Sequence, residues 1–217
     1  MQDDPHSGMA GSPPRIGMPL PNFRARTTMG MKSLTDYRGG WLILFSHPSD
    51  FTPVCTSEFV AIARAADRFA ALDCALMALS VDSLYSHFAW IRMIHERFGA
   101  KIAFPIIEDP TLEIARAYAM VPPDARDAAT VRYSYFIDPR GILRASTCYP
   151  VEIGRSVEEM LRMVTALQHA DRRGLLAPAE WHPGQPMLRP PSQEIDTVFD
   201  AEQASDWFYA PVGDDAA

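Results

Sequence analysis

Cys55 is the residue of this chain with the clearest capacity for chemistry, because of where it falls. The apolar run Trp41–Phe45 before it predicts a buried strand, and a helical pattern follows it to about Leu72. Thr52 suits the helix N-cap, where its hydroxyl would accept from a free backbone N–H, and Pro53 suits the first helical position. Cys55 then occupies the third helical position, where unpaired amides and the helix dipole favour a thiolate over a thiol.

The sulfur of Cys55 is expected to point into the protein. Phe59, Ile62 and Phe69 follow Cys55 at helical spacing, so the cysteine lies on the apolar face of its helix. A thiolate in such a pocket is a nucleophile for a small electrophile. A lone cysteine near a helix start is more often a small buried residue without chemistry, so its neighbours must decide between the two interpretations.

Those neighbours form a distinctive string. The pattern Pro48-x-x-x-Thr52-x-x-Cys55 resembles the active-site signature of the peroxiredoxins. The longer string Ser-His-Pro-x-Asp-Phe-Thr-Pro-Val-Cys-Thr is similar to the one-cysteine branch of that family and its archaeal-type relatives. The resemblance covers roughly Ile16 to Pro211.

The resemblance implies a role for each residue of the site. The Cys55 thiolate would attack the O–O bond of hydrogen peroxide or an alkyl hydroperoxide and become a sulfenic acid. Thr52 would hydrogen-bond the peroxide and the sulfur, and Pro48 would shield the site from water. Arg132, at the start of a distant strand, would complete the pocket, where its guanidinium stabilises the thiolate and the leaving oxygen. Taken alone, Arg132 would be read as a surface salt-bridge partner.

Three supporting residues also match the family. His47 corresponds to a histidine beside the pocket, and Arg155 to a second arginine. Glu58 corresponds to an acid that orients the arginines by bidentate pairing. Each of the three has an alternative interpretation as a capping or surface group.

The other two cysteines favour a one-cysteine mechanism. The archaeal-type relatives carry resolving cysteines in a C-terminal arm, and this arm contains none. Cys74 and Cys148 fall within expected core strands, so both are predicted to be buried packing residues. Recycling would then need an external thiol, either a thioredoxin-like protein or a low-molecular-weight thiol. Gly40 stands where some animal members have the serine of a Gly-x-Ser-x-Gly phospholipase motif, so that activity is not expected.

Two other functions remain open at the level of sequence. The same cysteine could serve a peroxide sensor or a redox-switched binding scaffold, in which oxidation changes a partner contact. The chain could also be an inert structural protein of the same fold.

Strands and helices alternate along the chain, which predicts an α/β fold with a central mixed sheet and helices on both faces. This order resembles a thioredoxin-like fold with an N-terminal addition. The expected strands are Phe23–Thr28, Met31–Leu34, Trp41–Phe45, Cys74–Val81, Pro105–Ile107, Arg132–Ile137 and Ile142–Tyr149. The expected helices after the first run over about 84–98, Thr111–Tyr118 and Ser156–Ala170.

Composition divides the chain into three parts. Residues 1–14 are rich in Gly, Pro, Ser and Asp and predict a flexible leader. Residues 15–170 would form the thioredoxin-fold peroxidase domain that the resemblance implies. Residues 171–217 are a proline-rich extension that still carries aromatic residues such as Trp181, Trp207 and Phe208. We expect this extended arm to bury them against another subunit of a homodimer, with a ring of dimers as a further option, or else against its own domain.

Charge and composition exclude several classes of function. The net charge is −7 and no basic stripe is visible, so nucleic acid is not an expected partner. No apolar run approaches the ~20 residues of a membrane helix, and we expect no membrane association and no secretory signal. The three cysteines form no Cys-x-x-Cys and the six histidines lack metal-ligand spacing, so no metal or cofactor is predicted. A reducing cytoplasm is the expected compartment.

Overall fold

The computed structural model describes residues 14–122, 125, 128–199 and 207–213. The predicted leader, residues 1–14, therefore lies almost entirely outside the described residues. The elements up to the helix that carries Cys55 are β1 (Arg24–Thr27), β2 (Gly30–Ser33), the 3-10 helix η1 (Leu34–Tyr37), β3 (Trp41–Ser46) and α1 (Pro53–Arg64). They are followed by α2 (Ala66–Ala71), β4 (Cys74–Ser80), α3 (Leu84–Phe98), β5 (Ile106–Glu108), α4 (Glu113–Ala117), β6 (Arg132–Ile137) and β7 (Leu143–Tyr149). The last elements are α5 (Val157–Arg173), β8 (Met187–Arg189), α6 (Ile195–Phe199) and β9 (Ala210–Val212).

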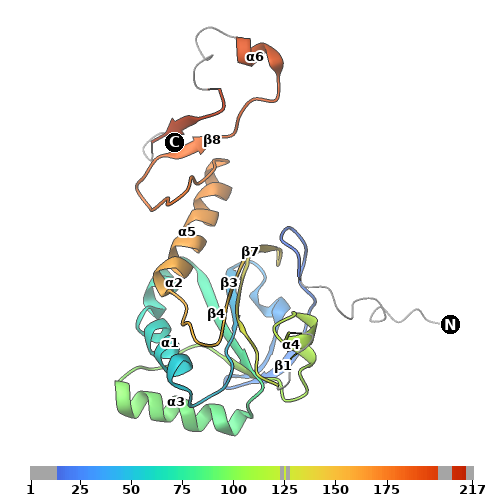
Figure 1. The fold of residues 1–217 in the computed structure, drawn as a ribbon, viewed down its shortest axis with the longest axis vertical. Coiled ribbons are helices and arrows are strands. Elements are labelled where there is room, and N and C mark those ends of the chain that lie inside the picture. Colours follow the sequence, from blue (N-terminus) through green and yellow to red (C-terminus); the bar gives the residue numbers. More distant parts are fainter. Residues whose placement is uncertain (1–13, 123–124, 126–127, 200–206, 214–217) are drawn as a thin grey trace, which may run out of the picture. The chain divides into compact units, whose positions relative to one another are not determined.

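A seven-stranded mixed sheet forms the centre of the fold, in the order β2-β1-β5-β4-β3-β6-β7. β3, β4 and β5 are parallel neighbours, while β6 runs antiparallel to β3 and β7 runs antiparallel to β6. The helices α1 and α3 lie on one side of the sheet and α4 lies on the other (Figure 1). The predicted mixed sheet with helices on both faces is confirmed.

The two faces of the sheet have separate cores because side chains alternate along each strand. β3 is buried on both faces along its whole length. Leu42 and Leu44 point to the face covered by α4, where they join one apolar cluster with Tyr118. Phe45 points to the opposite face, where its ring lies 5.7 Å from that of Phe59 on α1. The helix that carries Cys55 therefore packs directly on the central strand.

Some predicted boundaries are wrong by a few residues. The single helix expected to reach Leu72 is two helices, α1 and α2, which meet at Ala65, where the backbone has φ −98° and ψ 4°. The apolar spacing continues across this junction, so the sequence pattern does not reveal it. The helix expected from Thr111 begins only at Glu113, because Leu112 takes a left-handed conformation with φ 61°.

The C-terminal residues 158–217 form a second compact unit, which includes almost all of α5. This division falls earlier than the boundary at residue 170 expected from composition. Within the unit β8 and β9 pair as an antiparallel ribbon. Trp181 is fully buried here beside Ala166 and Met187, and its Nε1 donates to the carbonyl oxygen of Gln185 at 3.0 Å. Trp181 is therefore buried within the single chain, and it needs no second subunit for its burial.

Other aromatic residues of this unit remain exposed in the single chain. The exposed fractions are 78% for Phe199, 63% for Phe208 and 53% for Tyr209. Among the residues that the structure describes, no helix has the length and apolar character needed to cross a membrane.

Candidate active site

The cysteine helix begins as its sequence predicts. Thr52 is the N-cap of α1 with an extended backbone, and Pro53 occupies the first turn. The amide N–H of Thr56 donates to the Thr52 carbonyl at 2.9 Å, which starts the helical hydrogen bonds. Cys55 is fully buried. Its sulfur thus lies inside the protein, at the end of α1 that favours negative charge.

The predicted capping bond of Thr52 is wrong. Its hydroxyl accepts nothing from the first turn of α1 and instead donates to the carbonyl oxygen of Ser49 at 2.9 Å. The chain turns sharply between them, because Phe51 has a left-handed backbone with φ 57°, and this turn brings the carbonyl within reach. Pro48 is buried in the same connection between β3 and α1.

Arg132 reaches the sulfur from the first residue of β6. Its Nη1 lies 3.3 Å from Cys55 Sγ, and its side chain is 2% exposed. Two further bonds fix the guanidinium, from Nη2 and Nε to the carbonyl oxygen of Val151, at 2.7 and 3.2 Å. A buried guanidinium at this distance stabilises a thiolate and any negative charge that develops beside it.

Glu58 holds both arginines of the site. Its Oε2 accepts from Nη1 of Arg132 at 2.7 Å and from Nη2 of Arg155 at 2.8 Å. Its Oε1 accepts from Nε and from the backbone N–H of Arg155, at 2.9 and 2.7 Å. Burial alone would raise the pKa of Glu58, but the hydrogen bonds and charge of Arg155, with the charge of Arg132, outweigh it and lower the pKa. The carboxylate is therefore ionised and bridges two buried cations.

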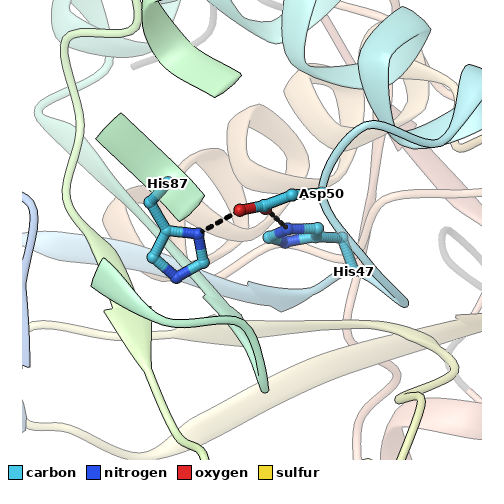
Figure 2. A group of neighbouring side chains, drawn as sticks. All are labelled: His47, Asp50 and His87. Atoms are coloured by element: carbon cyan, nitrogen blue, oxygen red, sulfur yellow. Dashed lines mark hydrogen bonds and ion pairs between the residues drawn. The ribbon is translucent and has the colours of Figure 1, made fainter. Parts of the chain in front are cut away.

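His47 lies in a second buried cluster, with Asp50 and His87 (Figure 2). Asp50 Oδ1 is 3.0 Å from Nε2 of His47, and Oδ2 is 2.8 Å from Nδ1 of His87. The ring of His47 also stacks on that of Trp90, with the ring centroids 5.2 Å apart. Asp50 belongs to the string around Cys55, but no spacing in the sequence relates His87, on α3, to His47.

The same three residues are the one group among the described residues with the arrangement of a candidate metal site. Their ligand atoms all lie within 4.8 Å of one another. Spacing along the chain does not reveal this group, because its two histidines are far apart in sequence and only the fold brings them together. The nitrogen and oxygen atoms that face each other are at ordinary hydrogen-bond distances.

The two remaining cysteines differ from each other. Cys74 is buried in β4 as predicted, and burial raises the pKa of its thiol to about 12, which leaves it unreactive at neutral pH. The prediction that Cys148 is buried is wrong, since its side chain is exposed. Cys148 lies near the end of β7, the edge strand of the sheet, where alternate residues are open to solvent.

A cavity of about 640 Å³ lies between α1 and α3, lined in part by Thr56, Val60 and Met93. Neither Cys55 nor Arg132 is among the residues that line it. The cavity is thus separate from the contact between Cys55 and Arg132.

These features define a thiol enzyme on a thioredoxin-like sheet, with one buried cysteine held against a guanidinium. Residues 16–146 match the AhpC/TSA family, and residues 166–201 match the C-terminal domain of 1-Cys peroxiredoxin. The chain is 47% identical to peroxiredoxin 2 of Caldanaerobacter subterraneus subsp. tengcongensis, over 82% of this chain and 80% of that protein. It is 45% identical to a peroxiredoxin of Thermoplasma volcanium, over 89% and 96% of the two chains.

Solved structures agree with these sequence matches. A structure of yeast mitochondrial 1-Cys peroxiredoxin matches with a TM-score of 0.80 and 33% identity, over 91% of this chain and 99% of that one. A mutant of the peroxiredoxin 6 of Arenicola marina matches with a TM-score of 0.78 and 33% identity, over 85% and 87%. The chain belongs to the AhpC/TSA family of peroxiredoxins and is a thiol-dependent peroxidase with a thioredoxin-like fold.

Proposed function

We propose that Cys55 is the nucleophile of this peroxidase and that Arg132 is its principal electrostatic partner. The distance of 3.3 Å between Cys55 Sγ and Arg132 Nη1 carries the proposal, because both groups are buried and no other described side chain is bonded to that sulfur. Thr52 and Pro48 complete the peroxide site. Glu58 and Arg155 fix the guanidinium, and His47 forms part of the surrounding wall.

The peroxide step follows from this arrangement. The thiolate of Cys55 attacks one oxygen of the peroxide, and an S–O bond forms as the O–O bond breaks. Two electrons pass from sulfur to the peroxide, and the leaving oxygen takes up a proton to depart as water or an alcohol. Arg132 donates to the charge that develops on that oxygen, and the sulfur is left as a sulfenic acid.

We propose that an external thiol recycles the sulfenic acid. The extension after residue 170 contains no cysteine, and Cys74 is buried and unreactive. One thiol would displace water from the oxidised sulfur to give a mixed disulfide, and a second would release Cys55. The yeast relative is described with resolution by glutathione and thioredoxin systems. We therefore propose a low-molecular-weight thiol or a thioredoxin-like protein as reductant.

Steady-state consumption of hydrogen peroxide, with a panel of thiol reductants, tests both proposals. Cys55→Ser should abolish turnover, and Arg132→Ala should lower kcat/KM roughly 100-fold or more. Sustained cycling supports an enzyme, whereas a peroxide sensor would oxidise once and stop. Full turnover by Cys55→Ser would refute the assignment of the nucleophile.

We also propose that the protein is a homodimer, with a ring of dimers as the alternative. The exposed aromatic residues of the C-terminal unit, among them Phe208 and Tyr209, are unusual on a monomer surface and suit a subunit contact. Analytical ultracentrifugation of the full chain and of Phe208→Ser would test it, since the variant should dissociate more readily. The free state of all three cysteines fits a reducing cytoplasm, which we propose as the compartment.

A further inference from the structure

The cluster of His47, Asp50 and His87 contains buried polar atoms that the proposed peroxide step does not use. The side chains of the two histidines are 0% exposed and that of Asp50 is 1% exposed. His47 Nδ1 and His87 Nε2 are buried and lack a hydrogen-bond partner among the residues that the structure describes. Buried polar atoms without partners are rare in proteins, so this pair calls for an explanation.

The charge of Asp50 determines which imidazole nitrogens of the cluster carry protons. Burial would raise the pKa of Asp50, but the hydrogen bonds from His47 and His87 outweigh it and lower the pKa to about 2. An ionised carboxylate only accepts, so the facing nitrogens, Nε2 of His47 and Nδ1 of His87, must carry protons. Burial also lowers the pKa of His47, which keeps its ring neutral. Nδ1 of His47 is then an unpaired acceptor.

The fold places this acceptor on the same side of the sheet as Cys55. β3 pairs with β6 so that Phe45 lies opposite Ser134, which follows Arg132 by two residues on β6, and His47 follows Phe45 by two residues. Residues opposite each other on antiparallel strands project to the same face. The ring of His47 lies 4.8 Å from that of Phe59, one helical turn after Cys55.

Two other carboxylates near the cluster, Asp82 and Glu108, hold the backbone rather than the imidazoles, and Glu108 accepts from the backbone N–H of Leu84 at 2.9 Å. Asp82 accepts from the backbone N–H of Asp50 at 2.9 Å and from the hydroxyl of Ser80 at 2.9 Å. The hydrogen bonds that orient the rings of His47 and His87 are therefore those made by Asp50.

We propose that His87 is a positioning residue of the peroxidase, which acts through Asp50 to hold His47 in the tautomer with its proton on Nε2. His47 Nδ1 is thereby kept as a hydrogen-bond acceptor at the Cys55 site. Arg132 can only donate there, and the Glu58 carboxylate is already bonded to both arginines, so a free acceptor would orient the O–H of the peroxide or of the sulfenic acid. This inference rests on the proposed function of Cys55.

Two substitutions of His87 separate hydrogen bonding from packing. His87→Asn keeps an N–H at the position of Nδ1, whereas His87→Leu fills similar space without a donor. We expect His87→Leu to lose roughly 10- to 100-fold in kcat/KM for hydrogen peroxide and to change its pH profile, and His87→Asn to recover most of that loss. His95→Asn is the matched control, because His95 is exposed on the same helix.

The tautomer itself can be read by ¹⁵N NMR of the imidazoles in the wild-type protein. We expect the proton of His47 on Nε2 in the wild type and in His87→Asn. A proton on Nδ1 in the wild type overturns the proposal, even if the Leu variant fails to fold. Equal losses in the Asn and Leu variants would also overturn it, because packing alone would then explain them.

Metal analysis of the purified protein tests the competing occupant of the cluster. A stoichiometric zinc ion that is lost in His87→Leu would overturn the proposal, because the metal would replace both protons. A wild-type protein without peroxidase activity would instead refute the proposed function, and the tautomer measurement would still stand.

Discussion

The carboxylate of Glu58 offers the sharpest test of the active-site electrostatics. Glu58→Gln changes one oxygen to an amide nitrogen and leaves the shape of the side chain intact. The carboxylate accepts four hydrogen bonds from Arg132 and Arg155, two on each oxygen. The amide can accept on one oxygen only, and its nitrogen would turn two N–H groups toward guanidinium donors.

The size of the effect follows from burial. Glu58 and both arginines have side chains that are at most 2% exposed. Charges about 4 Å apart interact by about 4 kcal/mol at an effective dielectric constant of 20. Removing one partner from a buried ion pair typically destabilises a protein by about 3–5 kcal/mol, so we expect a loss of this size in the free energy of unfolding. Arg132 would also lose a restraint, and kcat/KM should fall about tenfold or more.

Urea unfolding and stopped-flow peroxide consumption measure these two effects. Glu96→Gln is the control, since its ion pair with Arg92 is exposed on α3 and should contribute less than about 0.5 kcal/mol. A Glu58→Gln protein that matched this control in stability and kept the wild-type rate would refute the reasoning that the carboxylate organises the two arginines.

Three further outcomes are expected. Cys148→Ser should keep turnover within about twofold when an external thiol is supplied, and a large loss would indicate that Cys148 takes part in recycling. Thr52→Val removes the hydroxyl bond to the backbone and should lower kcat/KM about tenfold while changing stability by only about 1 kcal/mol, with Thr52→Ser as the active control. Acid should destabilise the fold in two stages, read by urea unfolding at a series of pH values. His47 and Asp50 both have lowered pKa values in the folded protein, so the unfolded chain binds more protons and stability falls as the pH falls. The first loss of stability begins below pH 6.5, which is the ordinary pKa of histidine, and is due to His47. The second loss is due to Asp50 and amounts to about 2 kcal/mol. It comes as the pH drops from 3.8, the ordinary pKa of this group, to about 2, its pKa in the folded protein. Constant stability down to pH 3 would contradict this assignment.

The sequence by itself determined most of the elements and the position of the cysteine that we propose as nucleophile. Local rules suffice for these features: apolar runs define β3 and β4, and Thr52 with Pro53 defines the start of α1. The same local rules put Cys55 at the third helical position. The resemblance to the family also indicated Arg132, Glu58 and Arg155 as site residues, although nothing in their spacing could show that their side chains are in contact.

Only the tertiary structure decided how those distant groups combine. The pairing of β3 with β6 brings Arg132 to the sulfur across 77 positions of the chain. The packing of α3 brings His87 to Asp50, a partnership between residues 37 positions apart that no local pattern encodes. The exposure of Cys148 depends on β7 being the edge strand, which is a property of strand order and not of strand sequence. Hydrogen bonds between distant residues depend on which surfaces pack together, and the packing of the whole core determines which surfaces meet.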